Sequence, residues 1–370
     1  VLVEQTLDSV KVSFPLEQYG PLGKPGQVTY DQGGASNSDV TSRYSYSPSG
    51  LLYDELTSTN SAVLSKLSYS YDELNNIAEI QDALSPQKSQ TFAYESNRLV
   101  SVSIANIVTN TCQYDSSGNI VNKDGGNYSY NAHFPLKVQK GGVDVCSATQ
   151  DKCGRTSSRA TIAGTLDFSY DKRGNLSTIS SQGNNIRTIT SDHKGRRVRE
   201  EREDGTVTLF VSKSYKVERD SSGESISCYL IDDRGISASI ITKQGKNSTE
   251  YYHRDHKGSV TFVFDQTGNI TNTISYDIYG LPNVTSQDES PKYEQRTWDD
   301  GTSLYYFGAR YYDPFLGRFI TPDTSLGAPH MQPDALNRFA FNLNNPVNSF
   351  DPTGHFSWKD GVIMGAILLA

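Results

Sequence analysis

Short segments of the chain alternate between residues suited to a protein interior and residues suited to water. In residues 64–71, for example, Leu67 and Tyr69 would share one face of an extended strand. Residues 259–264 are rich in Val, Thr and Phe, which favour strands. No 3.6-residue period is sustained along the chain, and residues 333–339 could open only a short helical turn. The pattern predicts an all-β protein.

A motif recurs between these segments: an aromatic residue, Asp, two variable residues, Gly, Asn and an aliphatic residue. The Asp can accept hydrogen bonds from its own turn, and the Gly can adopt a positive φ without a Cβ clash. Each copy therefore predicts a strand, a D-x-x-G turn and a second strand. Successive hairpins would form one antiparallel sheet that has to curl or close, because a flat exposed edge aggregates. The close copies are 114–120, 170–176 and 264–270, and the looser ones are 71–77, 192–196, 220–223, 255–260 and 276–280.

The composition fits this prediction. The 370 residues include 23 Tyr and 30 Gly but only 2 Met, which favours strands and tight turns over long helices. The Tyr rings could stack on sugars, although covering the sheet is their commoner role. With 34 basic and 42 acidic residues the net charge is −8, which argues against nucleic acid as the main partner. The mixed charges of residues 194–202 are expected to line a solvated strand face.

Several patterns do not predict a cofactor or a metal site. Four cysteines, whose spacing matches no zinc or redox motif, are expected to be buried or half-buried free thiols: Cys112, Cys146, Cys153 and Cys228. Residues 253–256, His-Arg-Asp-His, are expected to form a turn and not a metal site. The sequons at Asn127, Asn175, Asn247 and Asn283 fit glycosylation only as patterns.

The ends of the sequence suggest a fragment of a longer protein. The chain begins at Val1 without a visible signal peptide. It ends in the apolar run 361–370, which is shorter than the roughly 20 residues of a membrane-spanning helix. We therefore expect no membrane span in these residues.

The region from residue 305 onward carries a more specific signal. Residues 305–323 contain R-Y-Y-D-P, G-R-F and P-D in order, 336–341 read L-N-R-F-A-F, and 345–354 end in D-P-T-G. Together with the Tyr-Asp turns, this order closely resembles Rhs proteins, a group that includes the C components of insecticidal toxin complexes and, more distantly, the teneurins. The resemblance is to their YD repeats and to the Rhs-repeat-associated core.

The resemblance implies a fold and a division of the chain. In that family YD repeats wind into a spiral, hollow β-shell, the core closes it as a plug, and a variable cargo follows. The expected regions are an N-terminal lead-in (1–40), a YD-repeat β-shell (41–289), the core (290–355) and the start of the cargo (356–370).

The resemblance also implies a candidate catalytic site. The family core is similar to an autoprotease with two aspartates, which map to Asp323 and Asp351, supported by Arg310. Two close carboxylates in a dry site cannot both ionise, so one can activate water while the other donates a proton. The expected cut lies at His355–Phe356, where the family usually has Leu in place of His355. From the residues alone, both aspartates could simply shape turns, and Arg310 could be a structural partner of a core carboxylate.

Two functions follow as alternatives. In the first, the chain is part of a secreted or delivered toxin that encloses its own C-terminal cargo, with a toxin-complex B-type shell or a secretion-system component as partner. In the second, it is a non-enzymatic cell-surface adhesion protein that binds glycans or another protein. We also expect poor solubility for the isolated piece, because a partial spiral leaves an open sheet edge.

Overall fold

The computed structural model describes residues 2–7, 10–15, 24, 26–31, 39–232, 235–283, 291–324, 336–355 and 357–359. Within these residues the regular structure consists of strands and short 3-10 turns, without an α-helix. The prediction of an all-β protein is confirmed. Residues 336–339 of the expected helical segment are not helical: residues 337–340 form a tight turn, in which the Ala340 amide donates to the Asn337 carbonyl at 3.0 Å. The start of that segment lies outside the described residues.

The strands of the large sheet are β1 (Leu2–Leu7), β2 (Val10–Pro15), β3 (Gln27–Asp31), β4 (Val40–Tyr46), β5 (Leu52–Ser58), β6 (Val63–Tyr71), β7 (Ile77–Asp82), β8 (Gln90–Glu95), β9 (Arg98–Ile104), β10 (Ile107–Tyr114), β11 (Ile120–Lys123), β12 (Gly126–Asn131), β13 (Phe134–Lys140), β14 (Val143–Gln150), β15 (Thr156–Thr161), β16 (Gly164–Tyr170), β17 (Leu176–Ser181), β18 (Asn184–Ser191), β19 (Arg197–Arg202), β20 (Val207–Ser212), β21 (Tyr215–Asp220), β22 (Gly223–Asp232), β23 (Gly235–Lys243), β24 (Lys246–Arg254), β25 (Val260–Asp265) and β26 (Ile270–Thr273). The remaining elements are β27 (Ser275–Tyr276), β28 (Pro282–Asn283), β29 (Thr297–Asp299), β30 (Leu304–Tyr306), β31 (Tyr311–Asp313), β32 (Arg318–Phe319), β33 (Ser349–Phe350), β34 (Trp358–Lys359) and the 3-10 turns η3 (Pro86–Lys88), η4 (Tyr293–Gln295) and η6 (Asn342–Asn344).

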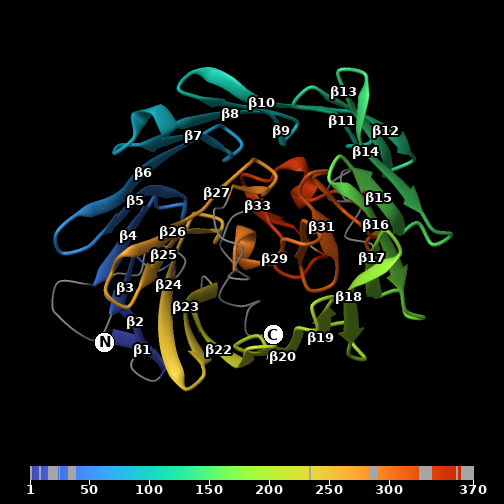
Figure 1. Ribbon diagram of the computed structural model, residues 1–370. Coiled ribbons are helices and arrows are strands. Elements are labelled where there is room, and N and C mark those ends of the chain that lie inside the picture. Colours follow the sequence, from blue (N-terminus) through green and yellow to red (C-terminus); the bar gives the residue numbers. More distant parts are fainter. Residues whose placement is uncertain are drawn as a thin grey trace.

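Strands β1 to β26 form one antiparallel sheet in which each strand pairs with the next one along the chain. We call this sheet the wall. It curls into a ring in Figure 1, and its first strands come to lie against β22 and β23. Buried side chains from both ends of the wall share one apolar cluster, in which Tyr30 packs edge-on against Tyr251. The wall therefore overlaps itself as a spiral.

The repeated motif forms the turns of the wall. The Oδ1 atom of Asp115 accepts hydrogen bonds from the backbone amides of Ser117 and Asn119, both at 2.9 Å. Its Oδ2 atom accepts a hydrogen bond from the Asn119 side chain at 2.8 Å. Gly118 adopts φ +74°, and a bulge precedes the turn at Tyr114. The same backbone pattern recurs at Asp72, Asp151, Asp171, Asp192, Asp255, Asp265 and Asp277. The weak copy at 220–223 differs, because it is a two-residue hairpin between β21 and β22.

The Tyr residues of the motif connect successive turns. Their hydroxyls donate to a backbone carbonyl just after the preceding turn: Tyr71 to Leu52, Tyr94 to Ile77, Tyr114 to Leu99, Tyr170 to Thr156 and Tyr276 to Val260, at 2.6–2.8 Å. These rings are therefore part of the packing of the wall, with their polar ends satisfied.

The described residues from 274 onward form a plug inside the ring (Figure 1). Its small sheets pair β27 with β28, β29 through β32, and β33 with β34. An aromatic core holds them together, and the rings of Tyr312 and Phe341 stack with centroids 3.9 Å apart. The prediction of a spiral shell with an inner plug is confirmed.

Buried polar contacts fix the plug to the wall. The guanidinium of Arg159 on β15 pairs with Asp313 of the plug at 2.6 Å, and both side chains are almost fully buried. The carbonyl of Gly118 accepts hydrogen bonds from the side chains of Arg318 and Asn344 of the plug, both at 2.9 Å. The position of the plug therefore depends on specific turns and strands of the wall.

Three local expectations need correction or refinement. Residues 194–202 are not wholly solvated, because Arg197 and Glu200 form a buried ion pair at 2.7 Å, with Arg197 stacked over Tyr306 of the plug. His253 lies buried at the end of β24, and the turn begins only at Asp255. Among the free thiols, Cys112 and Cys146 are buried and Cys228 is half-buried, but Cys153 is exposed.

The described residues contain no helix long and apolar enough to cross a membrane. They also contain no cluster of three or more His, Cys, Asp or Glu side chains arranged to hold a metal ion.

Candidate active site

The structure brings all three predicted site residues together in the plug. The Nη2 atom of Arg310 lies 3.0 Å from Oδ2 of Asp323 and 3.6 Å from Oδ2 of Asp351. All three residues are buried, and Asp351 has no exposed surface. Two carboxylates that are far apart in sequence therefore share one guanidinium nitrogen away from bulk water.

Short segments at the ends of small strands position these groups. Arg310 directly precedes β31, Asp323 follows β32, and Asp351 follows β33. The Arg310 guanidinium stacks 3.6 Å from the ring of Phe319, which fixes its plane. Its Nε donates to the carbonyl of Gly354, and so the guanidinium also contacts the chain beside the expected cut.

The segment from Asp351 repeats the turn chemistry of the wall. Its Oδ1 accepts the amides of Thr353 at 3.1 Å, Gly354 at 2.7 Å and His355 at 3.2 Å. Gly354 has φ +79°, and a Cβ there would lie 2.6 Å from the carbonyl oxygen of Phe307. Only glycine fits this close approach between the two loops. The turn places the His355 amide directly over the Asp351 carboxylate.

The two carboxylates of the site lie in different surroundings. Burial raises the pKa of Asp351 above its ordinary value, and the charges of Arg310 and Arg296 oppose this increase only in part. Burial likewise lowers the pKa of Arg310, against the opposing effect of both aspartates. Asp323 has a different environment, because its Oδ1 lies 2.8 Å from Nδ1 of His355. Burial thus favours the neutral form of the Asp351 carboxyl.

His355 contacts the candidate site through its side chain, which the sequence did not predict. Phe356, on the far side of the expected cut, lies outside the described residues, and the chain is described again at residues 357–359. There β34 pairs with β33, with Ser349 opposite Lys359. Along the chain, the expected cut therefore lies between two strands that pair with each other.

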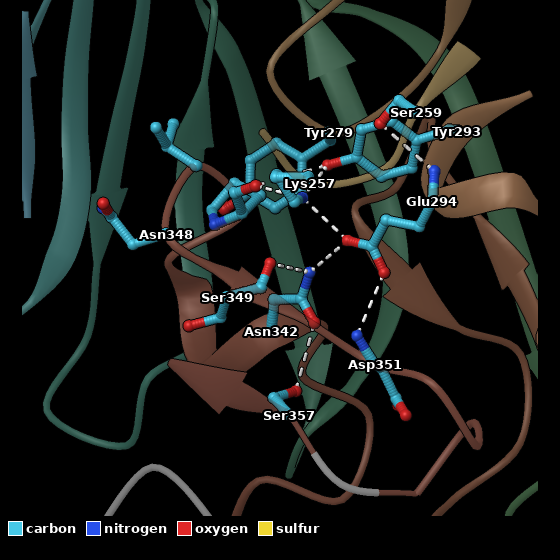
Figure 2. A network of polar contacts seen from close by, with 12 residues as sticks. Lys257, Ser259, Tyr279, Tyr293, Glu294, Asn342, Asn348, Ser349, Asp351 and Ser357 are labelled. Carbon is cyan, nitrogen blue, oxygen red and sulfur yellow. Dashed lines mark hydrogen bonds and ion pairs between the residues drawn. The ribbon is translucent and has the colours of Figure 1, made fainter. Parts of the chain in front are cut away.

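Sequence reasoning missed four further residues around the site. Arg338 donates through Nε to the Asp323 carbonyl at 2.6 Å, and its own carbonyl accepts the Asp323 amide at 2.9 Å. Lys257, Glu294 and Asn342 form a buried network behind Asp351 (Figure 2). Arg338 could have been selected from the L-N-R-F segment, but no pattern in the sequence links the other three to the site.

Comparison with known proteins identifies the family. The family model described as "Teneurin YD-shell" matches residues 17–347. The chain belongs to the teneurin YD-shell family. It is 30% identical over 260 residues to the tRNA3(Ser)-specific nuclease WapA of Bacillus spizizenii, which covers 66% of this chain and 11% of that protein. It is also 29% identical over 119 residues to the toxin subunit YenC1 of Yersinia entomophaga, covering 30% of this chain and 12% of that protein.

Solved structures show the same fold for this YD-shell chain. The crystal structure titled TcdB2-TccC3-TEV matches 94% of the chain with a TM-score of 0.72 at 20% identity, and this match covers 20% of that chain. The crystal structure of TcdB2-TccC3 matches 95% with a TM-score of 0.71 at 19% identity, again covering 20% of that chain. The chain thus spans about a tenth of the WapA nuclease and about a fifth of the solved toxin-complex chains.

Proposed function

We propose that this chain is the shell and plug of a toxin-type YD-shell protein, which encloses a C-terminal cargo and cuts itself at His355–Phe356. The observation that carries the proposal is the meeting of Asp323 and Asp351 at Arg310, beside Gly354 and His355. The toxin-complex and WapA relatives support a secreted or delivered protein. In this proposal the wall acts as the shell, the plug up to residue 355 acts as the autoprotease, and residues 356–370 are the start of the cargo. A B-type shell component or a secretion-system component would be the external partner.

The proposed reaction is hydrolysis of the peptide bond after His355. Asp323 is the ionised partner. It takes a proton from a water molecule while the oxygen of that water bonds to the His355 carbonyl carbon. Asp351 is the protonated partner and donates to the carbonyl oxygen, consistent with its raised pKa. When the carbon–nitrogen bond breaks, the proton on Asp323 passes to the amide nitrogen of Phe356, and Asp351 recovers its proton from the tetrahedral carbon's hydroxyl.

Geometry supplies much of the expected rate. The bond is intramolecular, and the turn at Asp351 already holds the His355 amide 3.2 Å from the Oδ1 atom. Holding reacting groups in this way can contribute several kcal/mol, on the order of 7–11 in well-oriented cases. Arg310 positions both carboxylates and also holds the Gly354 carbonyl next to the cut.

The test is to purify the native protein that contains residues 1–370 and to separate it under denaturing conditions. Wild type is expected to yield a fragment beginning at Phe356, identified by mass spectrometry, whereas Asp323→Asn and Asp351→Asn remain uncut. Asp144→Asn, on an exposed part of β14, is the matched control and should cut as wild type does. A wild-type chain that stays intact, or cutting that persists in both aspartate variants, would overturn the proposal and favour a non-enzymatic adhesion protein.

A further inference from the structure

A turn of the wall contacts the plug directly behind Asp351. This turn joins β24 to β25 and contains Lys257 and Ser259. The Nζ of Lys257 pairs with Oε1 of Glu294 at 2.7 Å, and Oγ of Ser259 accepts the Glu294 amide at 3.2 Å. All three side chains are buried. Two groups of the wall therefore fix both the side chain and the backbone of one plug residue.

Glu294 also contacts the candidate site directly. Its Oε2 accepts the backbone amide of Asp351 at 3.0 Å (Figure 2). Glu294 itself has φ +46°, an uncommon backbone conformation for a residue with a side chain. Such a conformation persists where the surroundings hold it, and here Lys257 and Ser259 do so. The position of Asp351 is thus tied to a turn of the wall through a single carboxylate.

Asn342 extends the same network to the other side of the expected cut. Its Nδ2 donates to Oε1 of Glu294 at 2.7 Å and to the Ser349 carbonyl at 2.8 Å, and its Oδ1 accepts the hydroxyl of Ser357 at 3.2 Å. Ser349 precedes Asp351 and Ser357 follows Phe356. One amide side chain therefore contacts residues that precede and residues that follow the cut along the chain.

We propose that Lys257, Ser259, Glu294 and Asn342 are positioning residues that make self-cleavage depend on completion of the wall. The inference rests on the proposed function. The turn at Lys257 lies between two of the last strands of the wall, and it reaches its place only after β24 and β25 have paired. Until then Glu294 lacks the partners that hold it against Asp351. Cleavage then follows the pairing of these late strands and does not precede it.

The test must separate positioning from stability, because a buried ion pair that loses one partner destabilises the fold. We therefore compare two double variants in which both charges are removed. Lys257→Met with Glu294→Gln keeps an acceptor for the Asp351 amide, whereas Lys257→Met with Glu294→Met does not. The measurement is the cut fraction against time after pulse-labelled synthesis of the native protein, together with the melting temperature of each variant carrying Asp323→Asn.

Both variants lose the contact with Lys257, and the Met variant is expected to cut about tenfold more slowly than the Gln variant, the effect of roughly one net hydrogen bond. The uncut forms should melt within a few degrees of each other. Equal cutting by both variants would overturn the inference while leaving the proposed function intact. Failure of wild type to cut, by contrast, would overturn the proposed function itself.

A pH profile gives a readout that a purely structural role would not move. The charged groups that face Asp351 are Arg310, Arg296 and Glu294, with Asp323 across Arg310. The negative charge of Glu294 helps to raise the pKa of Asp351, and so its loss in Glu294→Gln, with Lys257 kept, should move the alkaline limit of cutting to lower pH. An unchanged limit would show that Glu294 does not act on Asp351.

Discussion

The Nδ1 atom of His355 lies 2.8 Å from Oδ1 of Asp323. The residue that precedes the expected cut thus contacts one of the two proposed catalytic carboxylates, while the other oxygen of that carboxylate contacts Arg310. If Asp323 is the ionised partner, as proposed, its carboxylate can only accept, and Nδ1 of His355 is the donor. The contact fixes the chain next to the cut by its own side chain.

This contact predicts the effect of changing His355. His355→Asn places an amide donor near the position of Nδ1 and should retain cutting. His355→Phe keeps a ring of similar size without a donor, and it should cut about ten- to a hundredfold more slowly, since a hydrogen bond to a charged group contributes about 1.5–3 kcal/mol. The cut fraction of the native protein, followed over time, measures both. Equal rates would show that the Asp323 contact plays no part in the reaction.

The environment of Asp351 predicts how stability depends on pH. Its pKa in the folded protein lies above the ordinary value of 3.8, so in the window between the two the folded chain binds a proton that the unfolded chain does not. Stability therefore falls as the pH rises through this window. Asp351→Asn removes the titration and should melt at a higher temperature than uncut Asp323→Asn at pH 8, with a smaller difference at pH 4. A difference that does not change with pH would contradict the raised pKa.

The same Asp→Ala substitution is expected to lower the free energy of unfolding by different amounts in two of the turns. Asp265→Ala removes hydrogen bonds within an exposed turn and should lower the free energy of unfolding by about 1–2 kcal/mol. Asp115→Ala removes the same bonds, but its turn also holds plug residues through Gly118 and Asn119. Its cost should be about twice as large. Denaturant unfolding of the uncut protein gives both values, and equal costs would show that the plug does not depend on this turn.

The fold was predictable because its signal is local. A D-x-x-G turn is specified within five residues, as Asp115 to Asn119 show, and repetition of such turns implies a meander. The turn at Asp151 was missed, although it has the same D-x-x-G-R pattern as the copy at 192–196 and its Arg155 side chain donates to the Asp151 carboxylate at 2.7 Å.

The site was predictable only in part. Asp323, Asp351 and Arg310 lie in recognisable motifs, whereas Lys257 is 37 residues from Glu294 along the chain, and their contact exists only because the plug lies inside the ring. The buried pair of Arg197 and Glu200 was mistaken for a solvated face for the same reason, since the plug that covers Arg197 is remote in sequence. Contacts between the wall and the plug carry no local pattern.

The contact between Arg159 and Asp313 predicts that one substitution lowers the free energy of unfolding strongly and that a second one restores it. Arg159→Met leaves Asp313 buried without its guanidinium and should lower the free energy of unfolding by about 3–5 kcal/mol. Adding Asp313→Leu removes the stranded charge and should restore most of the stability. Denaturant unfolding of the wild type and of these two variants measures both effects. If the double variant is as unstable as Arg159→Met, the cost comes from lost packing and not from an unpaired charge.

The close approach of two loops at Gly354 predicts a selective loss of cutting. Gly354 and Gly142 both have a positive φ, of +79° and +82°, so an Ala costs each about 1–2 kcal/mol of backbone strain. Around Gly142 an added Cβ meets nothing within 4 Å, whereas at Gly354 it meets the Phe307 carbonyl at 2.6 Å. Gly354→Ala must therefore separate the loop of Asp351 from the segment that carries Arg310. We expect Gly354→Ala to remain uncut and Gly142→Ala to cut like wild type, as measured by the appearance of the fragment beginning at Phe356. Normal cutting by Gly354→Ala would mean that the reaction does not need the contact between these two loops.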